Sequence, residues 1–132
     1  MNPPTPDPVF EVTDWRGRPV RLTRRTLENH KDKRLEYASH IEQVKATIPD
    51  PDLVGEAKNG AVSLFRHGLG RGNLANLFLQ VVVFYRGSPE RGTVATHHFT
   101  GSLGDVVIVE HRYQWLAGTR HDVRGIGDRD ED

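Results

Sequence analysis

The most constraining feature of the sequence is a run of apolar and β-branched residues at 77–86, LFLQVVVFYR. A run of this length and composition is typical of a buried strand, because β-branched and aromatic side chains pack well on a pleated surface. A second strand pattern, TVATHHFT, covers 93–100 after a turn that contains Gly87 and Pro89. The two runs predict an antiparallel hairpin, with 77–86 as the central strand of a sheet.

Two helices are predicted before most of this sheet. Residues 9–22 have the alternation and the central turn of a β-hairpin. A helix is expected at about 24–34, with Thr23 as its N-cap. A second helix is expected at about 38–48, where apolar residues recur at the helical period and Pro49 ends the run.

Further strand patterns complete the expected fold class. They cover 53–57, 62–67 and 105–113. Since the helical segments come early and the strands are joined by short turns, the expected class is α+β. The sequence predicts two N-terminal helices packed on one face of an antiparallel β-sheet.

The length and composition indicate one small domain. A chain of 132 residues has the size of a single domain. Pro-rich residues 1–8 and polar residues 118–132 are predicted to be disordered, which leaves 9–117 as the folded part. The chain has no cysteine, so disulfides and thiolate metal sites are excluded. No apolar stretch could span a bilayer and no signal-peptide pattern is present, which predicts a cytoplasmic protein that does not bind membranes.

Charge is unevenly distributed along the chain, although the formal net charge is zero. Residues 14–34 carry eight Arg or Lys against three acids, and residues 58–91 carry five against one. Acids outnumber basic residues in 35–57 and in 105–132. Segregation of this kind predicts a basic face that binds a polyanion such as RNA.

Four short segments point to a known group of proteins. They are VRLT at 20–23, VKATIPDPDLV at 44–54, LQVVV at 79–83 and VATHHFT at 94–100. In this order they resemble the phage-associated toxins of the barnase–EndoU–colicin–RelE group, over about residues 12–100. The resemblance implies a small RNase-type fold and cleavage of RNA by its own 2′-OH, without a metal or cofactor. It also implies a cognate antitoxin or immunity protein as partner.

The predicted strand at 93–100 supplies the first candidate catalytic residues. Cleavage of RNA without a metal needs a base for the 2′-OH and an acid for the departing 5′-oxygen, and histidine suits both tasks because it titrates near neutrality. Strict alternation places Thr96, His98 and Thr100 on one face of the strand and His97 on the other. We expect His98 in the site, with Thr96 or Thr100 orienting the phosphate.

The end of the first predicted helix supplies a second group of candidates. His30 is the expected partner of the strand histidine in proton transfer. Arg34, Lys33 and Arg66 are expected to bind phosphate through their positive charge. Tyr85 is a further candidate for substrate binding, since its hydroxyl is expected at the end of its strand.

Three alternatives stay open. Residues 30–36 lack the His-Pro-Glu motif of the toxins and Gln80 stands where they often have lysine, which favours a non-catalytic RNA- or protein-binding module on the same fold. An immunity or regulatory partner protein could use the acidic tail as its contact. A metal site could be built from His98, His67 and His111 on neighbouring strands, although our prediction is that no metal is bound.

Overall fold

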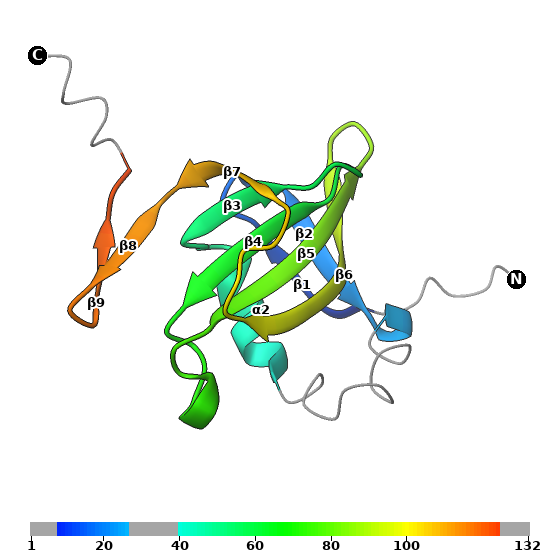
Figure 1. Cartoon of the computed structure of the whole chain (residues 1–132). Helices are drawn as coiled ribbons and strands as arrows, with labels where there is room; N and C mark the ends of the chain where they lie inside the picture. The colour runs from blue at the N-terminus through cyan, green and yellow to red at the C-terminus, as the bar shows by residue number, and fades with distance from the viewer. Residues whose placement is uncertain (1–7, 27–39, 125–132) are drawn as a thin grey trace, which may run out of the picture.

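The computed structural model describes residues 8–26 and 40–124 of the chain. The strands form a seven-stranded mixed sheet, of order β1-β2-β6-β5-β4-β3-β7, and a separate two-stranded hairpin (Figure 1). The large sheet consists of β1 (Pro8–Thr13), β2 (Pro19–Thr23), β3 (Leu53–Glu56), β4 (Val62–His67), β5 (Phe78–Arg86), β6 (Arg91–Thr100) and β7 (Val107–His111). The other elements are α2 (Ile41–Thr47), the 3-10 helix η2 (Gly72–Leu74), β8 (Tyr113–Leu116) and β9 (Thr119–Asp122).

The predicted central strand is confirmed. β5 lies in the middle of the large sheet and pairs in antiparallel register with β4 on one side and β6 on the other. Leu79, Val81 and Val83 alternate along its fully buried face. Among the described strands, only β2 and β6 pair in parallel. This pairing attaches the first hairpin of the chain directly to the strand that follows β5.

The sheet is curled around its core, and its two edge regions meet at one end (Figure 1). Trp15, in the turn after β1, donates a hydrogen bond from Nε1 to Glu110 Oε1 on β7 at 3.1 Å. Arg16 Nη2 lies 3.6 Å from the same oxygen. We call the side of the sheet inside the curl the inner face and the opposite side the outer face. α2 packs on the inner face, where its Val44 and the C-cap residue Ile48 are fully buried.

The structure corrects the predicted fold class. The protein is mostly β with a mixed sheet, and in residues 8–26 and 40–124 one helix of more than one turn, α2, packs on this sheet where two were expected on an antiparallel sheet. The helix expected at 38–48 is shortened to α2, and the one expected at 24–34 lies outside the described residues after 24–26, which are helical. The physical reason lies in the first hairpin. Its Val20 and Leu22 are fully buried and β2 pairs with β6, so the predicted hairpin extends the sheet and covers core surface that a second helix was expected to cover.

The connection from β6 to β7 crosses the outer face (Figure 1). β5, β4 and β3 lie between these two strands, so residues 101–106 pass over them. Val106 packs on Gly55 of β3, where even a Cβ atom would come within 2.9 Å of Val106 Cγ2. The side chains on both faces of β4 are consequently buried, as in the neighbours Leu64 and Phe65. The outer-face positions of β2, β5 and β6 that lie away from this crossing can form a binding surface.

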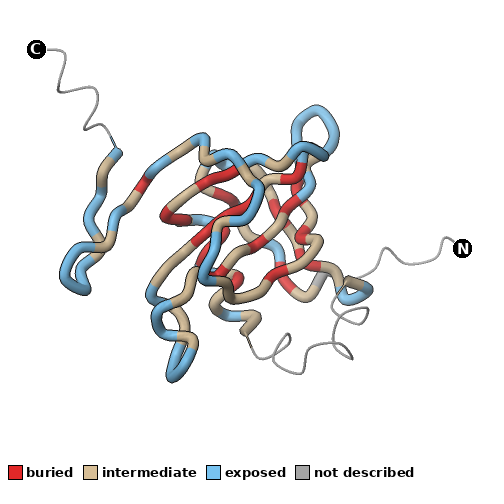
Figure 2. The backbone as a smooth tube through the Cα atoms, in the orientation of Figure 1, coloured by how far each residue is buried: buried red, intermediate tan, exposed pale blue. Residues whose placement is uncertain are grey.

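A short hairpin of β8 and β9 follows the large sheet. β9 lies within residues 118–132, the segment that the sequence analysis assigned to a disordered tail, and it pairs with β8 in antiparallel register. Arg120 of β9 donates from Nη1 to Asp50 Oδ2 at 2.8 Å and from Nε to Asp52 Oδ1 at 2.6 Å. Much of the hairpin is exposed (Figure 2). Because ion pairs attach it rather than an apolar stripe, the hydrophobic pattern does not reveal it.

A second arginine extends this ion-pair network. Arg112, which is buried, donates from Nη2 to Asp50 Oδ1 at 3.1 Å. Desolvation opposes ionisation of Asp50, but hydrogen bonds from Arg120 and Arg112 outweigh it and lower the pKa of Asp50 below its ordinary value. Asp50 therefore stabilises the fold above its ordinary pKa, and this contribution is lost as the pH falls through its lowered pKa in the folded state.

Candidate functional site

A β-bulge in β6 decides which side chains reach the outer face. The register changes from Val83 opposite Val94 to Val82 opposite Thr96, so Ala95 is the extra residue. Strict alternation holds from Thr96 to Thr100, with His97 on the opposite, inner face as expected, but it fails across the bulge. Val94, which alternation alone would place on the same face as His98, is fully buried on the inner face. The outer face instead carries Thr93, Thr96 and His98.

One row of side chains crosses four strands on the outer face. Glu11 of β1 is opposite Arg21 of β2, which is opposite Thr93 of β6, which is opposite Phe84 of β5. Directly paired residues of a sheet share a face, so these four side chains lie side by side. Arg86 and Arg91 form the next pair, at the turn between β5 and β6.

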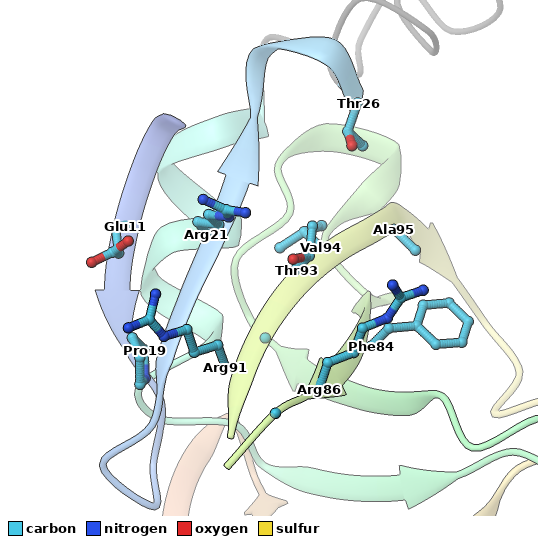
Figure 3. A pocket seen from close by; sticks show the side chains of 12 residues that line it. Glu11, Pro19, Arg21, Thr26, Phe84, Arg86, Arg91, Thr93, Val94 and Ala95 are labelled. Atoms are coloured by element: carbon cyan, nitrogen blue, oxygen red, sulfur yellow. The ribbon is translucent and has the colours of Figure 1, made fainter. Parts of the chain in front are cut away.

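These residues line a cavity of about 650 Å³, which we call the arginine cavity. A cavity of this volume is within the range of small-ligand sites. Figure 3 shows Glu11 and Arg91 on one side of the cavity, Phe84 and Arg86 on the other, and Thr93 between them. The side chains that define it are those of Glu11, Arg21, Phe84, Arg86, Arg91 and Thr93.

The positive charge of the arginine cavity is not neutralised within the described part of the protein. Arg21, Arg86 and Arg91 form no ion pair there, whereas the nearby Arg18 pairs with two carboxylates, those of Asp14 and Glu90. Three arginines against the single carboxylate of the cavity give it an excess of positive charge, which attracts anions.

The placement of two of these arginines also carries an energetic cost. Arg86 and Arg91 are cross-strand partners. Like charges directly opposite each other on a sheet destabilise it. An anion bound between them would remove this repulsion, so the arrangement favours a binding role over a purely structural one.

The two basic segments of the sequence meet at this cavity. Residues 14–34 contribute Arg21, and residues 58–91 contribute Arg86 and Arg91. The parallel pairing of β2 with β6 brings them together. The charge of both segments is evident from the sequence, but these three side chains are not among the predicted site residues, because no local pattern encodes a parallel contact between distant strands.

The predicted strand residues lie on the same face as the cavity but do not line it. His98 is opposite Gln80, and Thr96 is opposite Val82. Thr100, at the end of β6, donates from Oγ1 to the Ser102 carbonyl oxygen at 2.9 Å and accepts a hydrogen bond from the Ser102 amide, so it stabilises the following turn. The candidates His30, Lys33 and Arg34 lie outside the described residues, in the segment that follows the cavity residue Thr26.

Arg66 lies far from the predicted strand residues. It is on the inner-face side of β4 and donates from Nη1 to the carbonyl oxygen of Ala46 at 3.0 Å. Burial, followed by the charge of Arg120, lowers the pKa of Arg66. The structure therefore does not bring Arg66 together with Thr96 and His98, from which the sheet separates it.

Tyr85 is also on the inner face, and it belongs to a buried polar cluster. Its hydroxyl donates to Asp14 Oδ2 at 2.6 Å, and the Arg18 guanidinium lies 3.8 Å from the centre of its ring. Burial, together with the hydrogen bond to Asp14, raises the pKa of Tyr85 well above its ordinary value. These contacts account for the position of Tyr85 as a core residue, so a substrate-binding role is not needed to explain it.

The remaining histidines of the strands are dispersed. His67 and His111 line a second cavity, and His98 lies on β6 away from it. Within residues 8–26 and 40–124, no three His, Asp or Glu side chains are grouped so that they could hold a metal ion. In the same ranges, no helix has the length and apolar character needed to cross a membrane.

Comparison of this chain with known proteins gives no match to a family model, to a curated protein or to a solved structure. The resemblance to toxin nucleases therefore stays a prediction.

Proposed function

We propose that the protein binds single-stranded RNA at the arginine cavity and cleaves it as a metal-independent endoribonuclease of the toxin type. The observation that carries the proposal is the set of three arginines without ion-pair partners in the described residues around a partly exposed aromatic ring. Guanidinium groups bind phosphate through two parallel hydrogen bonds, which suits them to a nucleic-acid backbone.

Phe84 supports RNA over a simple phosphate as the ligand. Phe84 is 37% exposed on the wall of the cavity, beside Arg86. An exposed aromatic ring within a basic groove is a platform on which a base stacks, and such stacking contributes about 1–3 kcal/mol per base. Bases are free to stack in this way only in a single strand or a loop, so a duplex is a poorer ligand.

The cavity also holds a group for proton transfer. Glu11 is the one carboxylate among the described residues that line it. In the proposed reaction Glu11 removes the proton of the 2′-OH, the 2′-oxygen attacks phosphorus, and the bond to the 5′-oxygen breaks. The leaving oxygen takes a proton from a general acid, for which His98 and His30 stay the candidates. The arginines stabilise the charge on the phosphorane.

A second function has its own supporting observation. None of the described residues that line the arginine cavity is a histidine. A site that binds RNA without an acid for the leaving group would retain the strand intact, so a non-catalytic RNA-binding module is the alternative.

The test is incubation of the purified protein with a single-stranded RNA in EDTA. The proposal expects products with 2′,3′-cyclic phosphate and 5′-hydroxyl ends, while a DNA of the same sequence, which lacks the attacking 2′-OH, stays intact. Binding of RNA without any cleavage at pH 5 to 8 would select the non-catalytic module. Failure to bind RNA would refute both.

Loss of two cavity arginines should weaken RNA binding in a salt-dependent way. For the Arg21→Ala/Arg86→Ala variant we expect affinity to fall about tenfold or more, since each charged hydrogen bond contributes about 1.5–3 kcal/mol. The slope of log K against log salt should become shallower by about 0.7 per lost phosphate contact. Fluorescence anisotropy with a labelled RNA measures both. Arg71→Ala is the control, because Arg71 is exposed, equally charged and outside the cavity. An equal loss of RNA affinity in the double variant and in Arg71→Ala would contradict the assignment of the arginine cavity as the RNA-binding site.

A further inference from the structure

A second cavity on the outer face has a different chemical character. It has a volume of about 770 Å³ and lies between the large sheet and the β8–β9 hairpin. Its walls are mainly aromatic, and two exposed residues with side-chain amides, Asn76 and Gln114, are also among the lining residues. We call it the aromatic pocket, defined by His67, Asn76, Phe78, Tyr113, Gln114 and Trp115. We propose that it binds one planar, uncharged heteroaromatic ring of the nucleobase type.

The His67, Phe78 and Trp115 side chains leave ring faces available for stacking, whereas the Arg120 guanidinium lies 3.5 Å from the centre of the Tyr113 ring. The His67 and Phe78 ring centres are 5.4 Å apart with the rings inclined at 74°, and those of His67 and Trp115 are 5.3 Å apart at 54°. Rings that meet edge to face or at a tilt do not cover one another's faces completely. A flat ligand can therefore stack on the wall of the pocket.

The wall is also held rigidly before any ligand arrives. The carboxylate of the buried Asp52 accepts hydrogen bonds from Trp115 Nε1 at 2.7 Å, from the His67 backbone amide at 2.9 Å and from Arg120 Nε at 2.6 Å. The indole of Trp115 in addition lies against Gly68, where a Cβ atom would come within 2.6 Å of its Cη2. Since side chains fixed in advance lose little entropy on binding, this order favours a specific ligand.

The polar groups of the pocket match the edge of a base. The side-chain amides of Asn76 and Gln114 form no hydrogen bond with any described residue. Each amide offers both a donor and an acceptor, the combination that a nucleobase presents on its edge. The buried Nδ1 of His67 also has no hydrogen-bond partner in the described structure. An unsatisfied buried atom of this kind is costly and indicates a missing partner such as a ligand or a water.

The charge of the pocket excludes a phosphate as the main recognition element. No lysine or arginine is among the described residues that line it. Its one carboxylate, that of Asp52, is already occupied by three donors. An uncharged ring therefore fits better than an ionic ligand. The inference does not depend on the proposed nuclease function, since a free nucleoside and a base within RNA present the same ring.

The experiment uses Trp115 as the reporter. The chain has two tryptophans, so the Trp15→Phe variant leaves the indole of the pocket as the sole tryptophan. We expect adenosine or uridine, which carry no phosphate, to quench its fluorescence to saturation. Replacing both amides in the Asn76→Ala/Gln114→Ala variant should weaken binding about tenfold. Asn73→Ala is the control, because Asn73 is an exposed amide on η2 outside the pocket. Calorimetry on the unmodified protein repeats the measurement without the tryptophan substitution.

A free nucleoside and a base within an RNA strand could both supply the ring, and the experiment gives different results for the two. Saturable quenching by a free nucleoside that is unchanged in the Arg21→Ala/Arg86→Ala variant supports a small-molecule site. Quenching by an RNA oligonucleotide alone, reduced in the Asn76→Ala/Gln114→Ala variant, supports a subsite for one base of RNA. No saturable signal from nucleosides or RNA would overturn the inference, and so would equal binding by the amide variant and the parent. None of these outcomes decides whether the protein cleaves RNA.

Discussion

Replacement of Asp52 by alanine is expected to lower the free energy of unfolding by about 3–5 kcal/mol, the usual cost of removing one partner from a buried ion pair. The Asp52 side chain is 1% exposed and bonded to Arg120, whose side chain is 17% exposed. Without the carboxylate, Asp50 is the one ionic partner that Arg120 retains among the described residues, and the Trp115 indole and the His67 amide lose their acceptor. The hairpin and the aromatic pocket should therefore loosen together.

Urea denaturation followed by circular dichroism measures this change. Asp105→Ala is the matched control, since Asp105 is exposed and forms no ion pair with a described residue, and its effect should stay within about 0.5 kcal/mol. Asp52→Asn separates charge from hydrogen bonding, because an amide oxygen retains one acceptor. A loss below about 1 kcal/mol in Asp52→Ala would show that the ion pairs do not hold the hairpin on the sheet.

The hairpins of the large sheet could be predicted because their signals are local. The first hairpin and the pair of strands on either side of Gly87 are each formed by residues close in sequence, with apolar alternation and turn residues between them. The position of β5 at the centre followed from its apolar composition. In these elements propensity, pattern and turn chemistry agree, which is the condition under which sequence alone specifies structure.

The fold class could not be predicted because it depends on distant contacts. The parallel contact between β2 and β6 pairs Arg21 with Thr93, and nothing near either residue encodes it. Burial of Val20 and Leu22 on the sheet removed the need for a layer of two helices. The β8–β9 hairpin was missed because charged side chains, rather than an apolar stripe, attach it to the turn before β3.

Two features of the arginine cavity could not be predicted from the sequence. The bulge at Ala95 shifts the alternation of β6 by one residue, and no glycine or proline marks it. The cavity arginines come from two segments whose charge was evident, but whose spatial meeting needed the parallel strand pair. Sequence analysis could thus predict that a basic surface exists, but not which arginines form it.

Replacement of Glu11 by glutamine is expected to reduce the rate of RNA cleavage about 10²–10⁴-fold, the usual contribution of a general base. Glu11 lines the arginine cavity opposite Arg21, whereas His98 lies further along β6 and does not line it. The structure therefore favours Glu11 over His98 as the base for the 2′-OH. Since glutamine keeps the size of the side chain and removes its basicity, RNA affinity should change little.

Single-turnover cleavage in EDTA, together with RNA binding by anisotropy, separates the two effects. Glu56→Gln is the matched control, because Glu56 is an exposed carboxylate on β3 outside the cavity. His98→Ala in the same assay tests His98 as the general acid: loss of this proton-transfer group should lower the rate with binding retained. A Glu11→Gln variant that cleaves RNA at the rate of the parent would remove Glu11 from the reaction. If His98→Ala were then the inactive variant, His98 would be the base that removes the proton of the 2′-OH. The bound RNA would have to extend along β6 from the arginine cavity toward Gln80, which is opposite His98.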